Sequence, residues 1–433
     1  MKKLISLFAL VFFLAMGISY AQGWTHLGNF PNDTYMGNTG GHGVAVDPDG
    51  KIWSTPYGVT DSIFNGTIWK KIRVINVFNP DGSPASFSPI KTVTVGGVTD
   101  TLYNSSLGLR EDKDGNILHY TYDALYRINY QTGEGMNKIQ PVVGFGGTQP
   151  AVDDNGHIFT ATVLPGHPIQ EFTSDFTFIG NVVDESVGFS RTVEVSHDGN
   201  SVYWTSFTNN IIYIFSRPDE FGTFALADSI LPGFNCESAT WSRDGSLLWL
   251  SAGNGLNLPN TYPGITTYYS WTTWYAYNPA TNAIVDSIKW QFNTAGSPDE
   301  RPRGLAFSPD GRYAYVTCFG LSTYPIIQKF EDPNWVSVED QGQVVVNGYK
   351  LSQNYPNPFN PTTRISFELP VSGYTTLKVY DMLGNEVATL VQNELTTGTH
   401  SVNFNAANLA SGTYVYQLNV NGTRITNKMV LLK

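Results

Sequence analysis

Six copies of one hairpin signature between residues 43 and 311 constrain the fold of this chain more than any other feature. Each copy is a short strand-like segment that ends in Asp-Gly or Asn-Gly and is followed by a second apolar run. The turn glycines are Gly50, Gly115, Gly156, Gly199, Gly245 and Gly311. Such dipeptides between two strands indicate β-hairpins, because the turn needs a residue that accepts positive φ. Five of the six copies also carry Ser or Thr six residues after the glycine.

The spacing of these glycines predicts the architecture. The intervals are 65, 41, 43, 46 and 66 residues, and about 40–45 residues make one four-stranded blade of a β-propeller. The long intervals are too short for two blades, so we interpret them as single blades with insertions. The sequence predicts a six-bladed propeller over residues 22–335, with seven blades as the alternative. The last blade lacks an outer strand, which we expect residues 24–30 to supply.

Composition agrees with an all-β protein. Aromatic residues make up 14% of the chain and charged residues only 14%, a balance that argues against a helical bundle and against disorder. The net charge is −11, and residues 22–349 alone carry 17 basic and 32 acidic residues, a net charge of −15. We therefore expect a soluble monomer that avoids nucleic acid and anionic lipid.

The acidic turns do not fit calcium-binding loops. An EF-hand needs an acidic first ligand five residues before its glycine. That position holds Ala45, Arg110, Ala151, Glu194, Thr240 and Ala306. Only one of these is acidic, so we interpret all six segments as hairpins.

The N-terminus has the features of a secretory signal peptide over residues 1–21. Lys2 and Lys3 precede an apolar run from Leu4 to Met16, and Ser19-Tyr20-Ala21 offers small residues for cleavage after Ala21. The apolar run is too short to span a bilayer comfortably. We expect export through the periplasm.

A linker over residues 336–349 leads to a second unit, residues 350–433, whose strand-like runs predict a small Ig-like β-sandwich. The runs are 363–369, 375–380, 387–391, 400–404, 413–420 and 423–432. This unit resembles the type A sorting domain of the type IX secretion system in Tyr355-Pro-Asn-Pro-Phe-Asn-Pro361, in Val379-Tyr-Asp-Met-Leu-Gly-Asn-Glu-Val387, in Leu409-Ala-Ser-Gly-Thr-Tyr414 and in its basic end. The resemblance implies recognition by the type IX machinery, then release or attachment to surface lipopolysaccharide.

The repeats are similar to the NHL, YVTN and streptogramin-lyase-like propellers, most closely in Gly41-His-Gly-Val-Ala-Val-Asp-Pro-Asp-Gly-Lys-Ile-Trp53. That group contains enzymes and non-enzymes, so the resemblance does not decide function. We expect a binding module for a glycan, a protein or a small anionic ligand, without a cofactor. The alternatives are a lyase or lactone hydrolase with a divalent metal in the central channel, and a mere spacer.

The repeat register predicts a ring of side chains around that channel. The residues eight positions before each turn glycine are His42, Leu107, Thr148, Arg191, Glu237 and Arg303. Two arginines and a histidine against one glutamate predict a locally positive pocket for an anion such as a carboxylate. In the alternative interpretation, Arg191 and Arg303 pair with Glu237 as a structural plug.

Two further groups of residues are candidates. Trp271, Trp274 and Tyr275 lie in an aromatic-rich segment and would form a glycan-stacking surface, unless they pack between blades. Cys236 and Cys318 fall on the same face of adjacent blades in this register. A disulfide between them is therefore one prediction, and two buried free thiols are the alternative.

Overall fold

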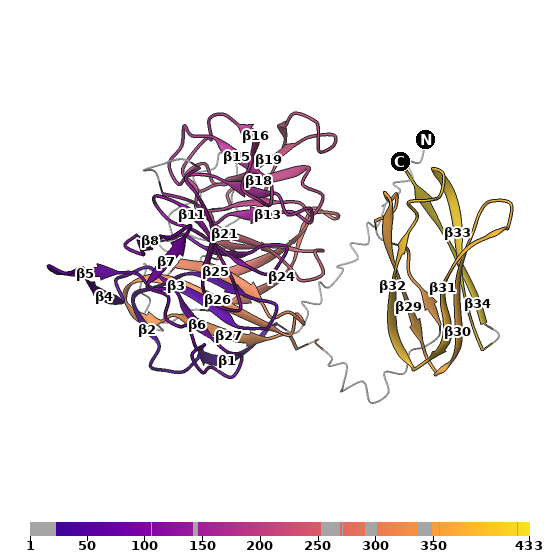
Figure 1. The fold of residues 1–433 in the computed structure, drawn as a ribbon, viewed down its shortest axis with the longest axis horizontal. Coiled ribbons are helices and arrows are strands. Elements are labelled where there is room, and N and C mark those ends of the chain that lie inside the picture. The colour runs from indigo at the N-terminus through magenta and orange to yellow at the C-terminus, as the bar shows by residue number, and fades with distance from the viewer. Residues whose placement is uncertain are drawn as a thin grey trace, which may run out of the picture. The chain divides into compact units, whose positions relative to one another are not determined.

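The computed structural model describes residues 23–433 except 105, 142–145, 253–268, 271, 291–300, 334, 336–348, 355 and 422. The predicted signal peptide and almost all of the predicted linker lie outside the described residues. Regular structure across the described part of the chain is entirely β (Figure 1). The chain divides into two compact units, Met1–Trp335 and Val336–Lys433. No helix able to cross a membrane is found in the described ranges.

Four sheets of the first unit each contain four antiparallel strands that are consecutive in the chain. The first contains β9 (Leu109–Glu111), β10 (Ile117–Tyr120), β11 (Leu125–Ile128) and β12 (Gly135–Ile139). The second contains β13 (Ala151–Val152), β14 (Ile158–Thr160), β15 (Ile169–Phe172) and β16 (Phe178–Val183). The third contains β17 (Val193–Val195), β18 (Ser201–Ser206), β19 (Ile211–Ser216) and β20 (Ala225–Ile230). The fourth contains β21 (Cys236–Trp241), β22 (Leu248–Ala252), β23 (Thr273–Asn278) and β24 (Ala283–Lys289).

The two ends of the first unit share a seven-stranded sheet. β25 (Arg301–Phe307), β26 (Tyr313–Pro325) and β27 (Ile327–Glu331) pair in order, and β1 (Thr25–Phe30) pairs antiparallel with β27. The predicted outer strand from the N-terminus is thus confirmed. β2 (Met36–Val46) pairs with β26 through its first half and with β3 (Ile52–Pro56) through its second, and β6 (Asn76–Phe78) follows β3.

The first long interval contains two hairpins outside these sheets. They are β4 (Asp61–Phe64) with β5 (Trp69–Ile72), and β7 (Thr92–Val95) with β8 (Val98–Thr101). The β4–β5 hairpin projects from the body of the unit at the left of Figure 1. These two hairpins account for part of the extra length of this interval.

All six predicted hairpin turns are present. The turn glycines have φ between 71° and 86°, and each donates its N–H to the carbonyl three residues earlier at 2.8–3.0 Å. The side chain at that earlier residue accepts a second backbone N–H; Asp47 does so from Lys51 at 2.9 Å and Ser242 from Leu247 at 3.0 Å. Only glycine adopts this left-handed conformation without strain, which fixes its place in every repeat.

The first strands of the six repeats are neighbours in a cyclic order: β2, β9, β13, β17, β21, β25 and β2 again. Glycine permits their close approach at three of the six equivalent positions, seven residues before the turn glycine. A Cβ on Gly43 would lie 3.0 Å from the Gly108 Cα, and a Cβ on Gly304 would lie 2.8 Å from the His42 carbonyl oxygen. Aromatic and aliphatic side chains fill the layers between successive sheets, with Trp53, Trp204 and Trp274 fully buried.

The second unit consists of two antiparallel sheets around one apolar core. One contains β28 (Lys350–Leu351), β29 (Thr362–Leu369) and β32 (Gly398–Asn405), and the other contains β31 (Glu386–Leu395), β30 (Gly373–Tyr380), β33 (Gly412–Val420) and β34 (Thr423–Leu431). All six predicted strands of this unit are present. Phe359, from the Pro-rich segment at the start of the unit, is buried in the core with Phe367, Tyr416 and Met429.

Candidate functional site

The predicted channel ring brings four ionisable residues together. Glu237 is fully buried and its Oε2 lies 2.5 Å from Arg191 Nε and 2.7 Å from Arg303 Nη1. Arg303 Nε donates to His42 Nε2 at 3.3 Å. His42, Glu237 and Arg303 each stand where their strand shows a β-bulge, a feature that commonly re-aims side chains.

Burial and like charges determine the protonation of this ring. Burial, with Arg303 and Arg191 nearby, lowers the pKa of His42 well below its usual value, so the imidazole is neutral. Burial also lowers the pKa of Arg303 to about 10, against the opposing effect of Glu237. Arg303 is 2% exposed and lies over the Phe319 ring, whereas the Arg191 side chain is 18% exposed.

These residues do not fit a divalent cation. Glu237 already has two guanidinium groups within ion-pair distance, and both would repel a dication next to His42. Across the described residues, no three His, Cys, Asp or Glu side chains group as metal ligands would. Thr148 does not join the charged cluster: its hydroxyl donates to the carbonyls of Gln149 and Ala161, both at 3.3 Å.

The possible disulfide does not form. Cys236 and Cys318 are both buried thiols and belong to different hydrophobic layers. The Cys236 thiol donates to the Ser238 carbonyl at 3.2 Å. Ser106 and Ser190, at the equivalent position of their repeats, make the same contact two residues ahead at 2.7 and 3.0 Å. Cys236 thus takes the place of a serine, and its thiol makes the same hydrogen bond within its own strand.

The two aromatic candidates that the structure describes, Trp274 and Tyr275, do not form a stacking surface. Trp274 is fully buried and its indole N–H donates to the Arg303 carbonyl at 2.9 Å. Tyr275 is half-buried against Phe234 and Tyr269. Trp271 lies outside the described residues. The prediction was wrong for Trp274, because an indole enclosed between two sheets has no face left for a sugar.

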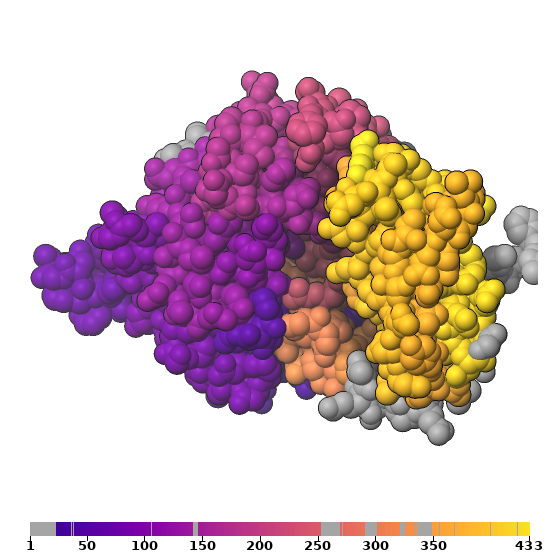
Figure 2. All heavy atoms as spheres, turned by 45° about the vertical axis from the view of Figure 1, so that its right-hand side comes forward, coloured from indigo at the N-terminus to yellow at the C-terminus, as the bar shows by residue number. Residues whose placement is uncertain are grey.

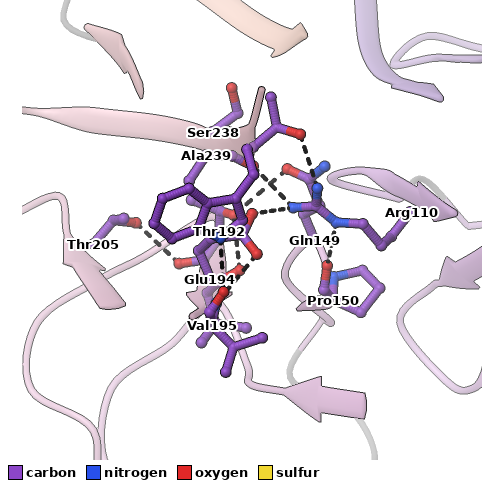
Figure 3. A network of polar contacts seen from close by, with 12 residues as sticks. Arg110, Gln149, Pro150, Thr192, Glu194, Val195, Thr205, Ser238 and Ala239 are labelled. Carbon is purple, nitrogen blue, oxygen red and sulfur yellow. Dashed lines mark hydrogen bonds and ion pairs between the residues drawn. The ribbon is translucent and has the colours of Figure 1, made fainter. Parts of the chain in front are cut away.

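A second polar centre lies nearer the six turns, where Arg110 links four repeats (Figure 3). Its Nη2 donates to Glu194 Oε2 at 2.5 Å and to the Ala239 carbonyl at 2.9 Å. Nη1 donates to Thr240 Oγ1 at 2.9 Å, and Nε to the Pro150 carbonyl at 3.1 Å. Burial raises the pKa of Glu194, an effect that Arg110 opposes. One guanidinium therefore connects β9 with β17, β21 and the residue before β13.

A cavity of about 420 Å³ lies at this centre. Residues from all six repeats line it, including the small side chains of Ala45 and Ala306 and the Trp241 ring. Volumes of this order are typical of small-molecule sites.

Most of the charged groups around the cavity are paired. Arg243 Nη1 binds Glu111 Oε2 at 2.7 Å, and its other nitrogens donate to the carbonyls of Val46, Phe307 and Ser308. Asp154 accepts from His197 Nδ1 at 2.8 Å and raises the pKa of that histidine. Apart from the exposed Lys113, the charged side chains of the cavity lining are therefore paired.

The sequence contained the signal for this second centre. Arg110, Glu194 and Thr240 are three of the residues that stand five positions before a turn glycine, a register used above only to test for calcium loops. Strict alternation along a strand would put positions eight and five before the glycine on opposite faces. The bulges in the first strands change this alternation, which sequence reasoning did not anticipate.

Comparisons with known proteins identify the class of the second unit. Residues 353–432 match the secretion system C-terminal sorting domain. In this unit Asn354 donates to Thr363 Oγ1 and the Pro356 carbonyl, both at 2.9 Å. Asp381 accepts the N–H groups of Leu383 and Asn385 at 2.9 Å. Asn354, beside one of the segments that carry the resemblance, and Asp381, within another, therefore hold turns next to the strands of this unit.

Comparisons over the whole chain give remote similarities only. No curated protein matches it. Hydrazine synthase of Kuenenia stuttgartiensis aligns with 64% of this chain and 73% of its own at 12% identity and a TM-score of 0.42. PorZ, a surface component of the type IX secretion system of Porphyromonas gingivalis, aligns with 96% of this chain and 59% of its own, at 14% identity and a TM-score of 0.39. Raptor of Chaetomium thermophilum aligns with 72% of this chain and 30% of its own, at 12% identity and a TM-score of 0.45. The chain thus spans only 59% of PorZ and 30% of Raptor, and scores this low establish no common fold.

Proposed function

We propose that this protein is a ligand-binding six-bladed β-propeller carried to the cell surface by its sorting domain. The match at residues 353–432 supports type IX export, to the surface or into the medium. The cyclic order of the six first strands supports six blades rather than seven. The closure of the last sheet by β1 supports the same count.

The ligand class follows from the cavity at the Arg110–Glu194 centre. At this centre Arg110, Arg243 and His197 are each paired with a carboxylate, and the exposed Lys113 is the remaining cation of the lining. Hydroxyl groups donate and accept at once, so they can add to such paired groups. Trp241 supplies an aromatic ring beside them. A short, uncharged glycan is therefore the ligand that we propose for this cavity.

Filling the cavity tests this proposal. Glycan-array screening of residues 22–433 should identify a bound neutral oligosaccharide. Ala306→Leu places a larger side chain on the cavity wall and should weaken binding of that glycan at least tenfold in calorimetry. Ala225→Leu, on an exposed part of β20, is the matched control and should bind like the wild type. An array without hits, or full binding by Ala306→Leu, would contradict the proposal.

The second candidate is an anion at Arg191 and Arg303. The partial exposure of Arg191 favours it, and the shared contact with Glu237 weakens it. Binding of a carboxylate ligand that Arg191→Ala abolishes without a large loss of stability would support this site. Stability loss with no anionic ligand would support the plug.

Export is tested separately. Removal of residues 351–433 should leave the first unit in the periplasm, because the sorting domain carries the signal for the second translocation step. Cell fractionation and surface proteolysis would detect it there. Surface display of the truncated chain would contradict this role.

A further inference from the structure

The β4–β5 hairpin carries large apolar side chains at its end. Trp69 is 69% exposed, Ile68 56% and Phe64 52%. Phe64 and Trp69 are directly opposite in the strand register, with their ring centroids 5.6 Å apart. Exposed apolar residues that occur singly need no explanation, but three at the end of one hairpin indicate a contact surface.

The hairpin is firmly attached to the unit at its base. Ile72 is fully buried, Lys91 pairs with Asp61 at 2.6 Å, and Arg73 donates to the carbonyls of Tyr57 and Tyr103. Figure 2 shows the hairpin as a projection from the surface, at the left of the view. The end of the hairpin is therefore held away from the body rather than folded onto it.

Charge at the hairpin differs in sign from the rest of the unit. Residues 59–73 contain Lys70, Lys71 and Arg73 against Asp61 alone, a local net charge of +2. The four residues of each strand extend roughly 13 Å, which exceeds the Debye length of about 8 Å at physiological salt. The acidic body therefore does not cancel the positive charge near the end of the hairpin.

We propose that the β4–β5 hairpin docks on an anionic lipid bilayer. Tryptophan and phenylalanine favour the interface between headgroups and acyl chains. The strand register places Lys71 on the same face as Phe64 and Trp69, where it meets lipid phosphate as the rings insert. The proposal departs, at this hairpin alone, from the expectation from net charge that the unit avoids anionic lipid.

Vesicle flotation tests the proposal with the chain from residue 22 to 433. Vesicles of phosphatidylglycerol and phosphatidylethanolamine should bind the protein, and phosphatidylcholine vesicles should bind it much more weakly. Phe64→Ala with Trp69→Ala should lower the partition coefficient at least tenfold. Lys71→Ala should lower it about fivefold, and Lys70→Ala, on the opposite face of the hairpin, should lower it less.

A matched control distinguishes docking from general stickiness. Phe221 is 90% exposed on a different loop, so Phe221→Ala should bind vesicles like the wild type. Brominated acyl chains should quench part of the tryptophan emission, and Trp69→Phe should remove that part. Absence of binding to anionic vesicles would overturn the proposal, and it is the result expected if the hairpin binds a protein instead. Equal losses in the Phe221 and Phe64–Trp69 variants would also overturn it.

Discussion

Glu237→Gln tests whether the ring at the channel is held together by its own charges. The substitution keeps the shape of the side chain and removes the negative charge that Arg191 and Arg303 share. Arg191 is partly exposed and can turn toward water, but Arg303 is almost fully buried. Loss of one partner from a buried ion pair costs about 3–5 kcal/mol, because the remaining charge stays desolvated.

The size of the effect can be converted to a melting temperature. Unfolding entropy of about 2.1 cal/mol/K per residue gives about 0.65 kcal/mol/K for a unit of about 310 residues. A loss of about 4 kcal/mol therefore lowers Tm by about 6 °C. All ten tryptophans lie between Trp24 and Trp335, so tryptophan emission follows the first unit without interference from the sorting domain.

Two further variants serve as controls for Glu237→Gln. Glu331→Gln removes the partner of Arg312 in a partly exposed ion pair and should lower Tm by less than about 2 °C. Arg303→Met in the Glu237→Gln background removes the stranded charge and should recover part of the loss. A Tm change below about 2 °C for Glu237→Gln would refute the reasoning, since it would mean that water reaches the ring.

Three further predictions concern stability. Burial lowers the pKa of His119 to about 4, so its stabilising contribution is complete above pH 6.5 and is lost as the pH falls toward 4. In urea unfolding between these pH values, the free energy of unfolding of His119→Phe should therefore change by roughly 3 kcal/mol less than that of the wild type. Equal slopes of this free energy against pH would contradict the prediction. Cys236→Ser should change Tm by less than about 2 °C, and a wild-type Tm that falls under reducing conditions would instead indicate a disulfide. Gly304→Ala should cost about 1–3 kcal/mol because its Cβ would meet backbone atoms of His42 and Val44; Gly180→Ala, with no atom near its Cβ, is the control, and equal effects would refute the close-approach argument.

Local signals predicted much of the fold. The six turns, the strands of the sorting domain and the pairing of β1 with β27 all follow from dipeptides, alternation and one missing strand. These features depend on residues close together in the chain, or on the number of strands that each repeat needs. The ring of His42, Glu237 and Arg303 also came from the register, since equivalent residues of a repeat occupy equivalent places.

Features that depend on distant neighbours could not be predicted. The cavity at Arg110 and Glu194 exists because alanines from two other strands leave space there, and no local pattern reports that volume. Trp274 was a candidate for stacking because aromatic composition does not reveal which face a neighbouring sheet covers. The projecting β4–β5 hairpin left no sequence signal beyond an interval longer than one blade.

The pairing of β1 with β27 has a consequence for the order of events during export. Thr25 pairs with Glu331, so the first unit cannot complete its last sheet until more than 300 residues have emerged. Closing so long a loop costs about 5 kcal/mol of chain entropy, and contacts this distant in sequence slow folding. Cleavage after Ala21 would leave β1 only three residues from a new terminus, free to pair. Closure of the last sheet is therefore a late step in the folding of the first unit, because it needs both ends of that unit at once.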